Sequence, residues 1–246
     1  MIELFNTILA EPLYNLLVGI YAIVPGQDIG IAIIVLTIII KAILWPLQGK
    51  SLRSQRALQE LQPKINDLKK EYKDDKEGLA KAMMEMYSKE KVNPLSSCLP
   101  LLVQLPIIIA LYRVLLRGLN GEGNYYSLYS FVPDPGTIIP TFMGIVDLST
   151  PNIILAILAG IFQFIQAKMM IINKPPKQVQ GQEGSKDEAM MASMNKSMLY
   201  FMPVITVVIG ASLPGGLTLY WLVVNIVAVI QQLVYLRPKK KEASAA

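Results

Sequence analysis

Long uncharged, mainly apolar runs alternate with polar blocks along this chain. No Asp, Glu, Lys or Arg occurs within 29–40, 92–112, 148–167 or 197–236. The last run contains 40 residues, and the second and third contain 21 and 20. A helix of about 20 apolar residues spans the ~30 Å hydrocarbon core of a bilayer. The pattern therefore predicts an all-α, polytopic membrane protein.

The 40-residue run is too long for one span, and Leu213-Pro214-Gly215-Gly216 predicts a break within it. We interpret 197–236 as a hairpin of two helices. In all we predict five transmembrane helices, over 29–49, 93–117, 152–172, Ser197–Ser212 and Leu217–Leu236.

Residues 1–28 are predicted to form an external segment with an interfacial helix. Pro12 suits the first turn of a helix, and Glu11 lies beside its positive dipole end. Apolar residues then recur at helical spacing from Leu13 to Val24. This pattern is typical of a helix lying along the membrane surface. A short extra span is the alternative.

The largest polar block, 50–92, is predicted to be an antiparallel helical hairpin. Pro63 indicates a kink or a restarted helix, and Asp75 can cap the helix that follows a break at Asp74-Asp75. A solvated helical connector is the simpler alternative. Apolar residues spaced as in a coiled-coil seam precede the break, at Leu58, Leu61, Ile65, Leu68 and Tyr72.

Charge placement predicts the orientation. The chain is 53 % hydrophobic and only 17 % charged, with a mean hydropathy of +0.43 and a net charge of +5. Of its 23 Lys and Arg, 20 lie in the hairpin, in a predicted flexible loop (173–196, with Lys168 at its border) and in a basic tail (237–246). Residues 1–28 and the predicted external loop 118–151 contain no Lys or Arg, and the exceptions to the pattern are Arg113 and Arg117, near the outer end of the second predicted span. The positive-inside rule therefore places the basic segments in the cytoplasm and the N-terminus outside.

Several classes of chemistry are excluded. Cys98 is the only cysteine and histidine is absent, so a disulfide framework, common transition-metal sites and Ser/His/Asp or Cys/His catalytic sets cannot form. No Walker motif, GxGxxG or HExxH occurs. We expect a protein that is not an enzyme, with no metal and no cofactor.

Lys41 is the most informative position, because it lies about 18 Å into the first predicted span. A lysine there costs on the order of 2.5–3.5 kcal/mol, so it should face protein or water. It either extends past Trp45 to the interface or lines a hydrated cavity. Thr37, Gln104 and Asn225 can line the same cavity or bond to a neighbouring helix.

Methionines form a stripe at the predicted cytoplasmic entrance, at Met190, Met194, Met198 and Met202. With Met83 and Met86 of the hairpin they are candidates for an adaptable surface that receives apolar segments. Ordinary helix packing is the alternative for the stripe. The basic tail residues can bind anionic lipid or ribosomal RNA, or serve only as a stop-transfer flank: Arg237, Lys239, Lys240 and Lys241.

Several motifs together resemble one family. They are Asn93-Pro94-Leu95, Cys98-Leu99-Pro100 through Gln104-Leu105-Pro106 to Ala110-Leu111-Tyr112, Leu61-Gln62-Pro63-Lys64-Ile65, Asp147-Leu148-Ser149, Leu213 to Leu217, Leu219-Tyr220-Trp221 and Ile230-Gln231-Gln232. The chain is similar over about 12–236, in the same order, to the YidC family of membrane protein insertases. It resembles a bacterial form without the N-terminal anchor helix and large periplasmic domain.

The resemblance implies a five-helix core around a hydrophilic groove that is open to the cytoplasm and to lipid but closed outside. Thr37, Gln104 and Tyr220 match groove positions, and Lys41 stands where the family usually has arginine. Lysine keeps the charge but lacks the planar fork of donors that binds a carboxylate in two places. Nascent membrane proteins are the implied clients, with the ribosome and the Sec translocon as further partners and no specific nucleic acid sequence.

The predicted function is therefore membrane protein insertion in the bacterial inner membrane, without nucleotide hydrolysis. A secondary transporter or channel is the rival class. Proton-coupled transporters carry intramembrane carboxylates, and the predicted spans contain none; no inverted repeat is evident. A membrane chaperone without insertion activity remains a third interpretation.

Overall fold

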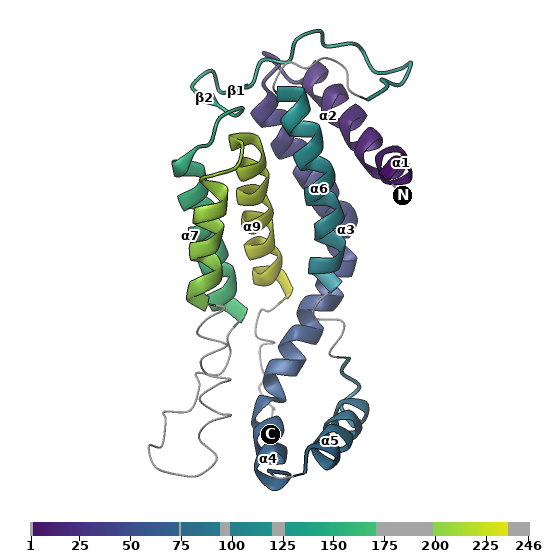
Figure 1. The fold of residues 1–246 in the computed structure, drawn as a ribbon, viewed down its shortest axis with the longest axis vertical. Helices are drawn as coiled ribbons and strands as arrows, with labels where there is room; N and C mark the ends of the chain where they lie inside the picture. Colours follow the sequence, from purple (N-terminus) through teal and green to yellow (C-terminus); the bar gives the residue numbers. More distant parts are fainter. Residues whose placement is uncertain (1, 74, 94–98, 120–125, 171–198, 236–246) are drawn as a thin grey trace, which may run out of the picture.

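Four long helices run along the molecule and carry most of its buried residues (Figure 1). The structure, a computed structural model, describes residues 2–73, 75–93, 99–119, 126–170 and 199–235. We call the end at which α3, α7 and α9 begin the upper end, and the opposite end the lower end. The long helices are α3 (Ile29–Glu60), α6 (Leu99–Leu119), α7 (Ile153–Met170) and α9 (Gly215–Tyr235).

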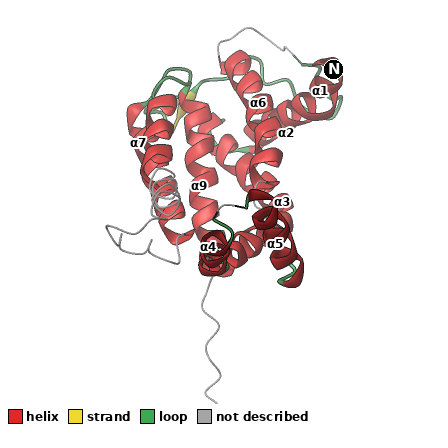
Figure 2. Cartoon of the chain, turned by 60° about the horizontal axis from the view of Figure 1, so that its bottom comes forward, coloured by secondary structure: helices red, strands yellow, loops and turns green. Residues whose placement is uncertain are grey.

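Three of these helices, α3, α7 and α9, are long and apolar enough to cross a membrane. Two shorter apolar helices cover Leu102–Leu116, within α6, and Leu199–Gly210. Figure 2 shows that helix dominates the described chain, with strand in one small patch. The mainly helical, apolar architecture agrees with the predicted class. The number of five membrane-spanning helices stays a prediction.

The N-terminal segment is one helical rod of three parts, α1 (Ile2–Phe5), the π-helix η1 (Asn6–Ala10) and α2 (Glu11–Ile23). Pro12 lies in the first turn of α2, as the sequence predicts. The rod crosses the upper end beside α3 and α6 (Figure 1). Most of the apolar stripe is buried there, although Leu16 is exposed. The buried members of the stripe are Leu13, Leu17, Ile20 and Tyr21.

Helix α3 does not end near residue 49, where the first span was predicted to end, but continues through Pro46 to Glu60. Pro46 removes one backbone hydrogen bond and normally costs about 3 kcal/mol in a helix interior. Packing against α9 offsets this cost. Gly49 lies so close to Tyr235 that an added Cβ would be 2.4 Å from the ring, and the Arg53 guanidinium lies 5.0 Å from the same ring centroid.

The lower end carries two shorter helices that contact each other, α4 (Gln62–Glu71) and α5 (Lys76–Lys89). Pro63 lies in the first turn of α4, which confirms the restarted helix. The Asp75 carboxylate accepts a hydrogen bond of 2.8 Å from the Gly78 N–H, which confirms the predicted cap. Lys64 of α4 forms an ion pair with Glu90 beyond α5, so the two arms are joined by charge as well as by packing.

A loop closes the upper end, and it contains two short antiparallel strands that the sequence analysis did not predict. They are β1 (Thr141–Phe142) and β2 (Val146–Asp147). Asp28 holds this loop on α3, because its carboxylate accepts from the Ile31 N–H at 2.9 Å and also from the Met143 N–H. The single Asp28 carboxylate therefore both caps α3 and holds the strand pair against it.

The same loop also fixes the start of α9. The Gly215 N–H donates to Thr150 and the Gly216 N–H to Leu148, both at 2.9 Å. Gly215 and Gly216 are thus the first turn of α9, whereas the sequence predicted that they form the break. A Cβ on Gly215 would lie 3.0 Å from the Thr150 carbonyl oxygen, so glycine permits this close approach. Hydrogen bonds from Ser149 lower the pKa of the Asp147 carboxyl in the adjoining turn.

Candidate functional site

Lys41 lies inside the helical bundle. It is twelve residues into α3, and 5 % of its surface is exposed. Its Nζ donates a hydrogen bond of 2.9 Å to Oε1 of Gln48, two helical turns closer to the lower end. Among the described residues, Lys41 is the only buried side chain with a formal charge, and its partner is neutral.

The rest of α3 explains why this lysine faces inward. Ile31, Ile38 and Ile43 are exposed on other faces of the helix and suit contact with lipid chains. Thr37, one turn before Lys41, is fully buried and donates to the Ile33 carbonyl of its own helix at 2.6 Å. The lysine extends toward the lower end, which is the direction that the sequence analysis proposed for a side chain passing Trp45.

Gln104 and Tyr220 meet between α6 and α9. The Gln104 amide donates to the Tyr220 hydroxyl, and the tyrosine is buried while Gln104 is half-buried. Both helices also contact α3. Two of the predicted groove residues are therefore bonded to each other across helices 116 positions apart in sequence.

Asn225 lies at a different interface. Its amide donates a hydrogen bond of 3.0 Å to the Ala159 carbonyl of α7, and it is buried. Asn225 lies five positions after Tyr220, which places the two side chains about 140° apart around α9. The structure thus joins Gln104 to Tyr220 and directs Asn225 toward α7.

Replacing Asn225 with leucine tests which role this residue has. If it mainly joins α7 to α9, the unfolding free energy falls by about 0.6–1.7 kcal/mol, as for other hydrogen bonds between membrane helices. Insertion by the folded protein then stays close to that of the unmodified chain. Thermal unfolding in micelles and insertion into vesicles measure the two effects. Unchanged unfolding with slowed insertion would contradict this structural role.

Four buried polar residues near the lower end were missed as candidate site residues: Gln48, Ser51, Gln231 and Gln232. Gln231 donates to the Trp45 carbonyl at 3.0 Å, beside Pro46. Gln232 is 1 % exposed, and its amide has no hydrogen-bond partner in the described chain. Gln48 could have been predicted from the sequence, because it follows Lys41 by seven positions. This spacing of about two helical turns puts both residues on the same face of the helix.

The other candidate surfaces lie at the lower end or outside the described residues. Met83 and Met86 are half-buried on α5, and Met84 between them is 72 % exposed. Met190, Met194 and Met198 fall outside the described residues, as do Arg237, Lys239, Lys240 and Lys241 of the tail. Their predicted roles therefore stay predictions.

Long apolar helices around a buried lysine and buried amides define an α-helical membrane protein. The family model described as 60Kd inner membrane protein matches residues 20–243. The chain belongs to this family.

Comparison with individual proteins supports the same family assignment. The chain is 39 % identical over 85 % of its length to "Membrane protein insertase YidC" of Francisella philomiragia subsp. philomiragia. It is 36 % and 38 % identical, over 92 % and 95 % of its length, to proteins with that name from Pelobacter propionicus and Shewanella halifaxensis. The matched region covers 32 %, 38 % and 38 % of these three relatives, so the chain spans about a third of their length.

Proposed function

We propose that this chain inserts transmembrane segments of newly made membrane proteins into the lipid bilayer. The observation that carries the proposal is the Lys41 charge, buried in an apolar helix and paired only with the neutral Gln48 among the described residues. Burial of an unneutralised charge is costly and marks functional positions in membrane proteins. The names of the relatives agree with an insertase.

The proposed mechanism is a lowered barrier for the polar tail of the client. Lys41, Gln104, Tyr220 and the Gln232 amide, which has no hydrogen-bond partner among the described residues, would line a hydrophilic groove open to the cytoplasm and to lipid. Such groups replace bulk water for a passing tail, because an unsatisfied polar group in hydrocarbon costs several kcal/mol. Burial of the client's apolar helix in lipid then drives insertion, so nucleotide hydrolysis is not needed.

The proposed orientation follows from charge. The lower end carries the lysine-rich α4–α5 hairpin, and the positive-inside rule places it in the cytoplasm. The upper end, with α2 and the loop held by Asp28, would then face outward, and α2 would lie along the outer membrane surface. Nascent membrane proteins are the proposed partners, and the basic tail is a candidate contact for ribosomes or anionic lipid beside the Sec translocon.

Reconstitution tests the proposal directly. Purified protein in vesicles should increase the insertion of a short single-span client above that of empty vesicles, without ATP. A transporter or a chaperone lacking insertion activity would give no increase. Cross-links from positions 37, 41, 104 and 220 to a stalled client would identify the groove.

Replacing residues 62–89 with a short Gly/Ser linker should reduce insertion in cells by about tenfold, because a client loses the raised local concentration that a receiving surface provides. Among the described long helices the hairpin packs mainly against α3, so thermal unfolding of the bundle should stay nearly unchanged. Lys64→Ala is the matched control, since loss of an exposed ion pair costs at most about 1 kcal/mol. Full activity without the hairpin would leave it as a connector.

A further inference from the structure

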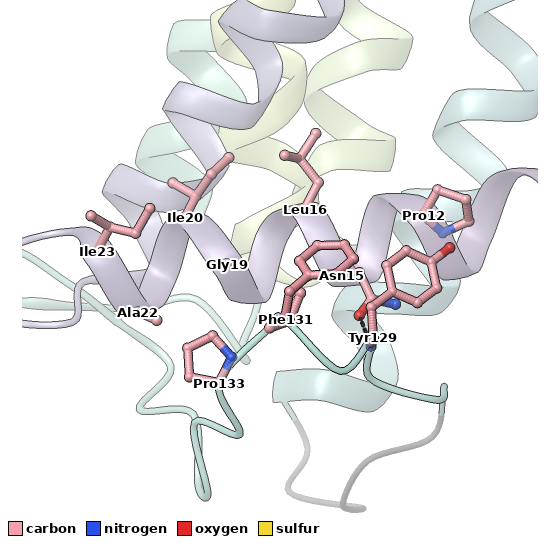
Figure 3. A pocket seen from close by; sticks show the side chains of 11 residues that line it. Pro12, Asn15, Leu16, Gly19, Ile20, Ala22, Ile23, Tyr129, Phe131 and Pro133 are labelled. Carbon is pink, nitrogen blue, oxygen red and sulfur yellow. Dashed lines mark hydrogen bonds between the residues drawn. The ribbon is translucent and has the colours of Figure 1, made fainter.

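An apolar groove of about 630 Å³ lies at the upper end, between α2 and residues 129–133 (Figure 3), and Lys41 is not part of its lining. We call it the α2 groove. Figure 3 shows Leu16, Ile20 and Ile23 along one side of the helix and Phe131 and Pro133 along the other. Gly19 lies between these two rows. The groove is therefore an elongated channel that follows α2.

Asn15 builds the wall of the groove. Its amide nitrogen donates to the carbonyls of Glu11 and Ser127, both at 2.9 Å, and its Oδ1 accepts from the Tyr129 N–H at 2.8 Å. Asn15 is 3 % exposed. Two of these three hydrogen bonds hold the 127–129 backbone on α2, and the third fixes the side chain on its own helix, so the groove is a fixed feature of the fold.

Gly19 forms the floor of the groove, and it differs from most other helical glycines in having no neighbouring side chain packed against it. A Cβ on Gly30, Gly49 or Gly160 would collide with a packed side chain, whereas a Cβ on Gly19 would meet nothing within 4 Å. Glycine within a helix costs about 0.5–1 kcal/mol relative to alanine. Close helix packing therefore does not explain glycine at position 19, and the lack of a side chain there leaves the space along α2 open.

The lining limits what can bind. It contains no charged residue, and residues 1–28 and 118–150 contain no Lys or Arg, so an anionic headgroup finds no cation here. A peptide backbone would need hydrogen-bond partners, yet Pro12 and Pro133 lack an N–H and both N–H groups of Asn15 are committed.

We propose that the α2 groove binds one acyl chain of a membrane phospholipid. This site goes beyond the proposed insertase function and rests only on the placement of the bundle in a bilayer. An acyl chain is uncharged, narrow and free of hydrogen-bonding groups, which matches the lining. The groove is also continuous with exposed apolar side chains, since Ile23 and Phe131 of its walls are 82 % and 80 % exposed. Lipid that surrounds the helices can therefore enter it directly.

Photo-cross-linking tests the site. The full chain is reconstituted in phosphatidylcholine vesicles that contain a phospholipid with a diazirine on one acyl chain, and labelled residues are mapped by mass spectrometry. We expect denser labelling at 129–133 and around Gly19 than at Ile154 and Ile157, which are exposed on α7 and report ordinary lipid contact. Equal or lower labelling of the groove would overturn the proposal.

Gly19→Leu places a side chain in the groove, where its Cβ would meet nothing within 4 Å, and should lower groove labelling about tenfold, equivalent to ~1.4 kcal/mol, while α7 labelling stays constant. Gly118→Leu is the matched control, because this glycine of α6 also has open space beside it and lies outside the groove. Groove labelling that persists in Gly19→Leu, or cross-links between two copies of the chain in place of lipid, would refute the acyl-chain site. Loss of groove labelling with normal client insertion separates this site from the proposed function.

Discussion

Replacing Lys41 with methionine should slow the insertion of clients that have an acidic tail by about tenfold. Methionine keeps the length of the side chain and removes its charge, so the change is mainly electrostatic. Two unit charges about 6 Å apart interact by roughly 3 kcal/mol at an effective dielectric constant of about 20. Half of that value in the transition state already corresponds to about a tenfold change in rate.

Two variants separate the charge from its surroundings. Lys41→Arg keeps the charge and should insert the same clients within about twofold of the unmodified protein, a change under ~0.5 kcal/mol. Gln48→Leu removes the hydrogen-bond partner of Lys41 and leaves the charge in place. If the effect came from disturbed packing near Gln48, this variant would reproduce the slow insertion of Lys41→Met.

The charge of the client's tail can be changed as well as that of Lys41. Changing the acidic residues of its tail to asparagine or glutamine should reduce the difference between Lys41 and Lys41→Met to nearly nothing, because the interacting pair is then already broken. Insertion is measured as the protease-protected fraction of client over time in vesicles. An equal loss for acidic and neutral tails would refute direct attraction by Lys41.

Local signals in the sequence predicted several elements correctly. Pro12 and Glu11 mark the start of α2, Pro63 the restart at α4 and Asp75 the cap of α5. Each depends on a residue and its immediate neighbours, which is why sequence alone suffices. Pro46 shows where prediction from neighbouring residues fails, because α3 continues through it. Whether a proline ends a helix depends on packing by residues far along the chain, here those of α9.

The candidate site was predictable where a residue type was unusual for its surroundings. Lys41 stood out because a charge in an apolar run is costly. Gln231 did not stand out, since an amide near the end of a span is common and its bond to Trp45 joins positions 186 apart. Asn225 had two open interpretations, and only the position of α7 shows which helix it contacts.

The closure of the upper end was not predicted, because its contacts come from a loop without hydrophobic periodicity. The Tyr21 hydroxyl accepts from the Ile139 N–H at 3.2 Å, and Leu148 is fully buried. Asp28 and Gly30 could be read in the sequence as a cap and an early helical residue. Nothing local indicated that a strand pair more than 100 residues later would pack against them.

Gly30→Ala should destabilise this closure by about 1–3 kcal/mol, the usual range for an overpacked site. The new Cβ would lie 2.2, 2.5 and 2.6 Å from Cδ2, Cγ and Cβ of Phe142. Since Cβ of Phe142 is attached to the backbone, rotation of the ring cannot relieve the contact, and β1 must shift. The shift would pull Met143 away from the Asp28 carboxylate. Thermal unfolding in micelles, followed by circular dichroism, measures the loss.

Gly19→Ala is the matched control, because the same change in a helix with open space should raise stability by about 0.5–1 kcal/mol. Opposite signs for one substitution at two helical glycines would isolate the contact with Phe142 from helix propensity. A second comparison uses Phe142→Gly, which removes all three contacting atoms. In that background Gly30→Ala should become neutral or stabilising, so the two changes are strongly non-additive. Additive losses would mean that α3 and β1 do not meet at Gly30 in the membrane.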